Sequence, residues 1–154
     1  MTISNSNILD CTLRDGGYYT NWVFEKSLVR KYLTTLKENK IRFVEIGFKF
    51  LKQDNYIGQY GTVNEHLVDW AFKVAKNNYG LMLNASEFKN FKKAEIKKII
   101  NKNFVLKKKS SLNFIRIASH IHESEIADCI AKNLKKLGYN VFINLMQITM
   151  IKFK

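Results

Sequence analysis

The sequence predicts an α/β fold in which helices pack on a parallel sheet. Three observations support this prediction. Short apolar segments of strand type alternate with segments of helical periodicity, and no proline interrupts the alternation. The 154 residues, 46% of them hydrophobic, are enough for one domain with a buried core. Such alternation is typical of parallel sheets joined by right-handed crossovers.

Five segments are expected to form strands. The first, residues 7–12, is short and apolar, and residues 42–48 are rich in the β-branched and aromatic residues that favour a buried strand. The other three cover residues 79–84, 113–118 and 140–147. With helices between them, these segments give the order β-α-β-α-β-α-β-α-β.

Four segments are expected to form helices. Two of them have apolar residues at helical spacing and cover residues 25–39 and 92–101, the second being rich in lysine. Thr62 and Glu65 form a capping-box pattern at the start of a third helix. The fourth covers residues 124–137 and is followed by Gly138, a typical C′ residue.

The composition excludes several classes of protein. The first twenty residues hold no apolar run of signal-peptide length, and no segment approaches the ~20 apolar residues of a membrane span. The two cysteines, Cys11 and Cys129, lie far apart, which argues against a disulfide scaffold or a cysteine-zinc site. We therefore expect a cytoplasmic protein with no membrane partner.

The formal net charge of +13 is compatible with two interpretations, a nucleic-acid binder or a lysine-rich surface. Only four of the 26 basic residues are arginine, the residue preferred for phosphate forks and base reading. The lysines also fall in several separate places along the chain. An anionic small-molecule substrate is therefore favoured over nucleic acid, and a basic nucleic-acid-binding module is kept as an alternative.

The most informative motif lies near the start of the chain, where Arg14 and Asp15 are followed by Gly16 and Gly17. The carboxyl ends of strands are where α/β enzymes place their chemistry. Asp15 can ligate Mg²⁺ or Mn²⁺ through oxygen, and Arg14 can hold a developing negative oxygen. The two glycines allow unusual backbone angles and close approach of a ligand. The alternative is an Arg–Asp pair at a structural turn.

Glu45 is a carboxylate inside the otherwise apolar strand of residues 42–48. Burial of an unpaired carboxylate is costly, so Glu45 needs a partner or a ligand. If the first two strands are neighbours in a parallel sheet, Glu45 lies near Arg14. This pair is either a simple salt bridge or a bridge that orients Arg14 for a substrate.

These residues resemble a known family. Residues 10–17 followed by residues 44–48 strongly resemble the DRE-TIM metallolyase superfamily, which includes hydroxymethylglutaryl-CoA lyase, 4-hydroxy-2-oxovalerate aldolase, and the isopropylmalate and homocitrate synthases. Residues 114–118 and 138–146 are also similar to its fourth and fifth strands, so the likeness runs through most of the chain. It implies a TIM-type (β/α)8 barrel, which takes about 250 residues. Residues 1–154 would be the N-terminal portion of this single domain, truncated after five strands and four helices.

The resemblance implies a metal-dependent aldolase or lyase that forms or cleaves a C–C bond at a pyruvate- or acetyl-derived enolate of an oxo acid. A divalent metal, Mn²⁺ or Mg²⁺, would chelate the oxo acid and lower the cost of the enolate. By the same resemblance Asp15 would be a metal ligand, Arg14 the enolate partner and Glu45 a supporting acid. Gly16 and Gly17 would lie beside the substrate.

Two departures from the family pattern concern the base and the metal. Some aldolases of the family use a histidine shortly after the Arg-Asp-Gly signature, where this chain has Tyr18 and Tyr19. The base is then Tyr18 through a relay, another group, or missing. The family's other metal ligands are a His-x-His pair on the seventh strand, which this sequence lacks. Asp15 alone would bind a divalent metal weakly.

A different His-x-His pair, His120 and His122, follows the fourth predicted strand. On a strand both rings would face the same side and could reach one ion, whereas an earlier end of the strand would separate them. The favoured interpretation places His120 near the substrate and His122 in a helix N-terminus. His66, in the first turn of a helix, is expected on the surface.

An open five-stranded sheet would leave strand edges and an apolar inner face exposed. We therefore expect a homo-oligomer, another partner or further residues to cover it. An inactive or regulatory fragment that keeps the fold without the chemistry is the alternative to an active enzyme.

Overall fold

The computed structural model describes residues 8–52 and 55–150. Five strands form one parallel sheet: β1 (Leu9–Asp10), β2 (Phe43–Phe48), β3 (Asn78–Asn84), β4 (Leu112–Ser119) and β5 (Asn140–Leu145). They lie side by side in chain order. That order is typical of a TIM-type barrel, whereas a doubly wound sheet reverses its order at a switch point. The predicted α/β fold of barrel type is therefore confirmed as a curled half-barrel.

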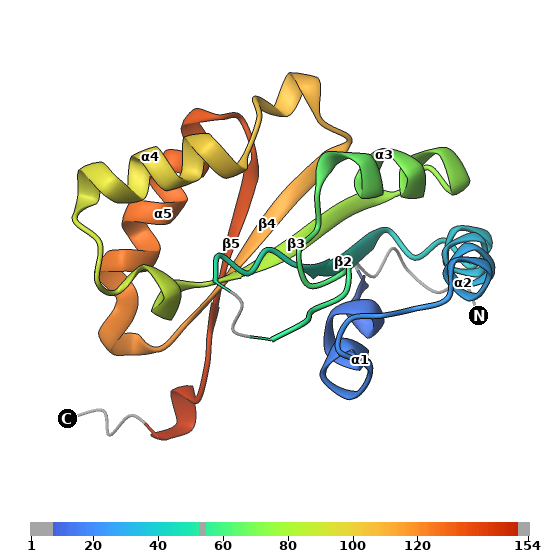
Figure 1. Ribbon diagram of the computed structural model, residues 1–154, viewed down its shortest axis with the longest axis horizontal. Helices are drawn as coiled ribbons and strands as arrows, with labels where there is room; N and C mark the ends of the chain where they lie inside the picture. Colours follow the sequence, from blue (N-terminus) through green and yellow to red (C-terminus); the bar gives the residue numbers. More distant parts are fainter. Residues whose placement is uncertain (1–7, 53–54, 151–154) are drawn as a thin grey trace, which may run out of the picture.

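Helices connect the strands and cover the sheet (Figure 1). They are α1 (Thr12–Thr20), α2 (Lys26–Glu38), α3 (Glu65–Val74), α4 (Lys93–Asn103) and α5 (Ser124–Lys136). Helix α2 packs against α3 and α4 against α5, while α5 also contacts β4 and β5. None of the helices in the described part of the chain combines the length and apolar character needed to cross a bilayer.

The main core lies between the sheet and its helices. It joins strand residues such as Ile46, Leu83 and Ile117 to helix residues such as Leu33 and Ile130. All five side chains are fully buried, each with 0% exposure. Apolar burial of this extent is the principal stabilising contribution in a small domain.

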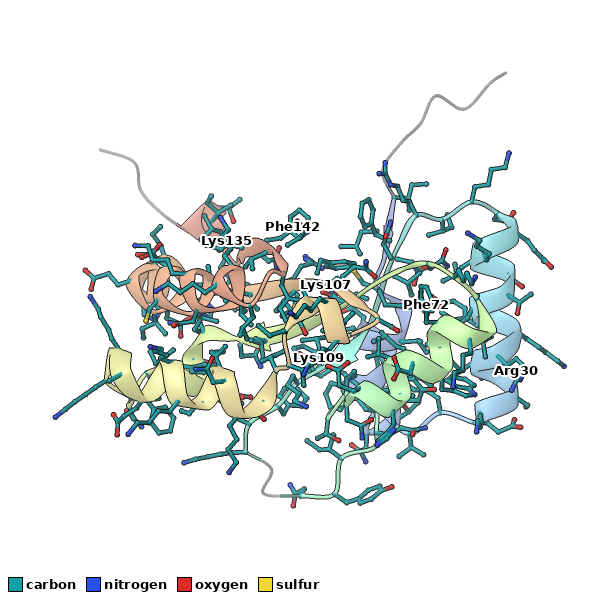
Figure 2. All side chains as sticks on the ribbon, turned by 90° about the horizontal axis from the view of Figure 1, so that it is seen from above. Arg30, Phe72, Lys107, Lys109, Lys135 and Phe142 are labelled. Atoms are coloured by element: carbon teal, nitrogen blue, oxygen red, sulfur yellow. The ribbon has the colours of Figure 1, made fainter. Side chains whose placement is uncertain are left out.

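The sheet has a second apolar region on its other face. Phe114 is buried but is not part of the main core cluster, and it packs edge-to-face against Phe43 and Phe142. Together with Leu9 and Arg116 these rings line a hollow at the inner side of the half-barrel. Phe142 projects from the edge strand β5 (Figure 2) and is 49% exposed.

The start of the chain differs from the prediction. The expected strand over residues 7–12 is β1 with two residues only, and Asn7 lies outside the described residues. Helix α1, which the sequence did not predict, begins at Thr12. The side chain of Asp10 favours this early start, because its Oδ1 accepts a hydrogen bond from the Thr12 amide at 2.9 Å.

The ends of two helices test the capping predictions. The capping box of Thr62 and Glu65 is wrong, because Asn64 is the N-cap of α3 and its Oδ1 accepts from the Leu67 amide at 3.0 Å. Gly138 follows α5 with a φ of +95°, which confirms its role as a C′ residue.

The basic side chains come from separate elements. Arg30 on α2 and Lys135 on α5 lie well apart in the molecule, and Lys107 and Lys109 lie in a short 3-10 turn before β4 (Figure 2). The positive charge of these residues is thus spread over the surface.

Candidate active site

Glu45 on β2 is the centre of a buried charged cluster, with 0% exposure. Its Oε2 accepts one hydrogen bond from Nε of Arg14 at 2.8 Å and another from Nη1 of Arg116 at 3.0 Å. Arg14 comes from α1 and Arg116 from β4. The predicted proximity of Glu45 and Arg14 is therefore confirmed, and a second arginine joins them.

The order of the strands explains how Arg116 reaches Glu45. The strand between them, β3, carries Gly80 directly opposite Glu45. A Cβ atom on Gly80 would lie 2.0 Å from the ring of Phe114, so the site has no room for a side chain there. The side chains of β2 and β4 can therefore meet across β3.

Arg116 was not among the site residues expected from the sequence. The same signal that identified Glu45 was present, since Arg116 is a charged residue inside the apolar strand 113–118. Recognising the pair also required the knowledge that β2 and β4 lie on either side of a glycine.

The cluster carries more positive than negative charge in its buried part. Two guanidinium groups share a single carboxylate, and Glu45 Oε1 is buried without a hydrogen-bond partner among the described residues. Burial lowers the pKa of Arg14, but the hydrogen bond and charge of Glu45 outweigh this effect and raise it overall. An arginine pair of this kind suits an oxyanion or a carboxylate.

Cys11 lies at the edge of this cluster, with its Sγ 3.4 Å from Nη1 of Arg116. Burial and then the charge of Glu45 raise the pKa of the Cys11 thiol. Its neutral form is thereby favoured, which does not suit a nucleophilic cysteine.

Asp15, the predicted metal ligand, contacts Nη1 of Arg14 and is 58% exposed on its side chain. In residues 8–52 and 55–150, the one group of three metal-ligating side chains lies elsewhere and does not include Asp15. The carboxylate of the nearby Asp10 is engaged by Thr12 and by the hydroxyl of Tyr32. Asp15 therefore supplies one oxygen ligand, and the described residues alone do not form a complete divalent-metal site around it.

Gly16 and Gly17 do not use the unusual backbone angles that glycine allows. Both lie inside α1, and neither has the positive φ that an unusual backbone angle would require. Gly17 is needed instead because a Cβ there would lie 2.0 Å from the ring of Trp22. The indole Nε1 of Trp22 donates to the backbone oxygen of Arg14 at 3.0 Å, so this contact helps to fix the arginine.

Tyr18, the candidate base, is 61% exposed, and its ring packs edge-on against Trp22 and Phe48. Partial burial of the side chain is the largest cause of the raised pKa of Tyr18. A tyrosine with a raised pKa holds its proton at neutral pH, which favours a donor over a base.

His120 and His122 follow β4, which ends at Ser119. His120 is the N-cap of a short 3-10 helix over Ile121–Glu123. Although the strand ends before His122, the two rings are not separated: they stack with centroids 5.4 Å apart. His66 is exposed in the first turn of α3, as predicted.

The fold and the cluster define an α/β half-barrel with paired arginines on a buried carboxylate at its first strands. Its fold and sequence are similar to those of the N-terminal domain of a "putative aldolase" from Bacteroides vulgatus, with a TM-score of 0.77 and 28% identity. The match covers 94% of this chain and 46% of the solved chain, so this chain spans about half the length of that protein. Neither a family model nor a curated protein sequence matches. The likeness supports an aldolase-like fold.

Proposed function

We propose that this chain supplies one side of the active site of a metal-dependent aldolase or lyase that acts on an oxo acid. The observation that carries the proposal is the Arg14–Glu45–Arg116 cluster, in which a fully buried carboxylate orients two cations. The similarity to an aldolase domain supports the same class of reaction. The substrate would be a hydroxylated or unsubstituted 2-oxo acid that reacts through a pyruvate- or acetyl-like enolate.

Such a reaction requires stabilisation of the negative charge that develops on the enolate oxygen. In cleavage, the hydroxyl proton leaves to a base, the C–C bond breaks, and its electron pair forms an enolate while the other fragment departs as an aldehyde or ketone. Arg14 would hold the developing oxyanion, and the hydrogen bond from its Nε to Glu45 supports this role. Arg116 would add a second positive charge for the oxyanion or the substrate carboxylate.

A divalent ion, when bound, would polarise the keto oxygen and make the enolate less costly. Asp15 is the residue that would ligate it in this chain, and the remaining ligands would come from outside the described residues. Tyr18 would serve as a proton donor or relay near Arg14, since its raised pKa keeps the hydroxyl protonated.

Binding of oxalate, a planar dianion similar to a pyruvate enolate, tests the arginine part of this proposal. We expect calorimetry at low salt to detect oxalate binding that weakens about tenfold in Arg116→Ala, because one charge-assisted contact is lost. Arg30→Ala is the control, since Arg30 is exposed on α2. Equal affinity in the wild type and Arg116→Ala, with both folded by circular dichroism, would refute the arginine assignment.

Binding of Mn²⁺ tests the metal part separately. Water-proton relaxation should report an Mn²⁺ affinity that Asp15→Ala abolishes. An Mn²⁺ affinity that is unchanged in Asp15→Ala would show that Asp15 is not the ligand, and no binding at millimolar Mn²⁺ would exclude a metal-dependent activity of this chain by itself.

A further inference from the structure

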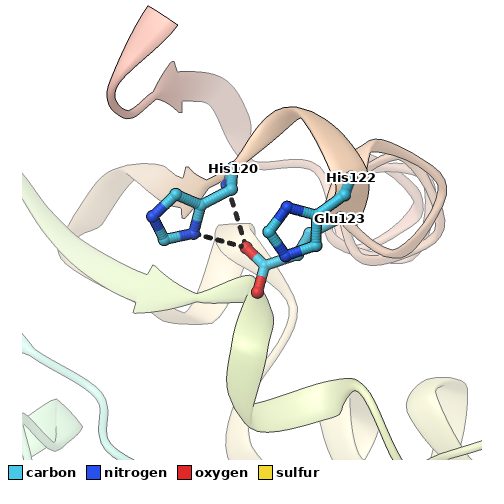
Figure 3. A group of neighbouring side chains, drawn as sticks. All are labelled: His120, His122 and Glu123. Atoms are coloured by element: carbon cyan, nitrogen blue, oxygen red, sulfur yellow. Dashed lines mark hydrogen bonds and ion pairs between the residues drawn. The ribbon is translucent and has the colours of Figure 1, made fainter. Parts of the chain in front are cut away.

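Three side chains of the types that can ligate a metal lie together in the turn after β4 (Figure 3). They are His120, His122 and Glu123, and one ligating atom from each lies within 4.8 Å of the other two. The imidazole rings are nearly parallel, with an interplanar angle of 12°. One ring nitrogen of each histidine and one carboxylate oxygen therefore lie close together, although the stacked rings do not yet point at one ion.

The backbone of the turn builds this arrangement. His120 has extended angles, φ −82° and ψ 163°, and the chain then enters the short 3-10 helix. The carboxylate of Glu123 folds back on His120: its Oε2 accepts from the His120 amide at 2.9 Å and lies 3.3 Å from Nδ1. Glu123 is thus held in place before any ligand binds.

The burial of Glu123 is the feature that most favours a cation. Its exposure is 6%, and the one ion pair found for it in the described part of the chain is with His120. Glutamate is rarely buried unless it is paired or coordinates a metal. His120 is partly exposed and His122 exposed, so an ion can reach the two imidazole groups beside Glu123 from solvent.

We propose that His120, His122 and Glu123 form a site for Zn²⁺ at the carboxyl end of β4. Two histidines and one glutamate with water in the fourth position are an established zinc ligand set. Imidazole nitrogen favours Zn²⁺ over the hard ions Mg²⁺ and Ca²⁺. Zinc–ligand bonds of about 2.0–2.2 Å require the ligand atoms to approach more closely than they do here, and the exposed His122 ring can rotate to achieve this.

This site does not depend on the proposed aldolase or lyase activity. It uses none of Arg14, Glu45, Arg116 or Asp15, and it would take a nitrogen-preferring ion instead of Mg²⁺ or Mn²⁺. The competing explanation is purely structural: Glu123 caps the turn, and the two rings stack beside it without a ligand.

Titration of the metal-free full chain with Zn²⁺ separates the two explanations. We expect calorimetry to give one equivalent of Zn²⁺, and NMR to show shifts of the His120 and His122 imidazole signals but not of His66. His122→Ala and Glu123→Gln should each weaken binding about tenfold or more, because each removes one of three protein ligands. The Glu123→Gln side chain keeps an oxygen that accepts from the His120 amide, so the turn is retained.

Two matched controls make the result specific. His66→Ala removes an exposed histidine on α3, and Glu125→Gln removes an exposed carboxylate two residues after Glu123. Both should bind Zn²⁺ as the wild type does, and so should Asp15→Ala. The proposal is overturned if Zn²⁺ leaves the His120 and His122 signals unchanged, or if His122→Ala and Glu123→Gln bind Zn²⁺ as tightly as the wild type.

Discussion

Arg14 and Glu45 form a buried ion pair in which Nε of the arginine donates to Oε2 of the glutamate at 2.8 Å. The two residues are far apart in the sequence, and the pair ties α1 to β2. The same oxygen also accepts from Arg116 of β4. One carboxylate oxygen therefore links three elements of the half-barrel.

Loss of the Glu45 charge should destabilise the fold strongly. In Glu45→Gln the largely buried guanidinium of Arg116 loses its counter-charge, and Arg14 keeps only its pair with the exposed Asp15. Removal of one partner of a buried pair costs about 3–5 kcal/mol. We expect a decrease of this size in the free energy of unfolding measured with urea. Asp128→Ala breaks the exposed Lys132–Asp128 pair and should cost under about 1 kcal/mol. Similar losses in the two variants would contradict the central role of Glu45.

Substitution of the two neighbouring glycines of α1 by alanine should change the stability of the protein in opposite directions. At Gly16 a Cβ would meet the Phe24 ring at an ordinary 3.7 Å, so Gly16→Ala should stabilise the helix by about 0.5–1 kcal/mol. At Gly17 it would lie 2.0 Å from Trp22, so Gly17→Ala should destabilise by about 1–3 kcal/mol through overpacking. Thermal unfolding of the two variants measures the difference, and a stabilising Gly17→Ala would refute the packing role.

The helix α1 shows why part of the fold was not predictable from sequence. Gly16 and Gly17 have low helix propensity, and residues 12–20 show no sustained apolar periodicity. The helix packs against β2 instead, and just past its end Trp22 packs against Gly17 and donates to the backbone oxygen of Arg14. The strands and later helices were predictable because their apolar patterns are local.

The residues of the candidate site also differ in how far the sequence predicts them. Glu45 was identifiable because a carboxylate in an apolar strand demands a partner, and Arg14 was the nearest cation in the expected topology. The contact between Arg116 and Glu45 could be predicted only with the strand order and with the position of Gly80 between them. The stacking of His120 on His122 depends on a 3-10 turn, which the alternating pattern of a strand does not predict.

Tyr60 should make the protein sensitive to alkali. Burial raises the pKa of Tyr60 to about 12, above the value of about 10 in an unfolded chain. Its contribution to stability is therefore complete below about pH 10 and is lost as the pH rises towards 12. In Tyr60→Phe the free energy of unfolding should decrease less steeply than in the wild type between about pH 10 and 12. An equally steep loss in this variant would contradict the prediction.

Near neutral pH the same variant should not be destabilised. The Tyr60 hydroxyl is buried and has no hydrogen-bond partner among the described residues. Replacement by phenylalanine removes an unsatisfied polar group and keeps the ring, which packs edge-to-face on Phe24 with centroids 5.4 Å apart. Urea unfolding should give a free energy equal to or above that of the wild type, and a loss above about 1 kcal/mol would indicate a partner for the hydroxyl.

Cys11 should react slowly with alkylating reagents in the folded protein. Burial and the Glu45 charge raise the pKa of its thiol, so the reactive thiolate is scarcer than in an unfolded chain at the same pH. The Cys129→Ser variant leaves Cys11 as the one cysteine. When its rate of alkylation by iodoacetamide is plotted against pH, the midpoint of the curve should lie at a higher pH for the native protein than for the protein in urea. The same shift means that Cys11 contributes fully to the free energy of unfolding below the pKa of about 8.5 of an unfolded chain. This contribution is lost as the pH rises through the pKa of the folded protein. A native midpoint at or below the denatured one would mean that the arginines, which act in the opposite direction, dominate the site.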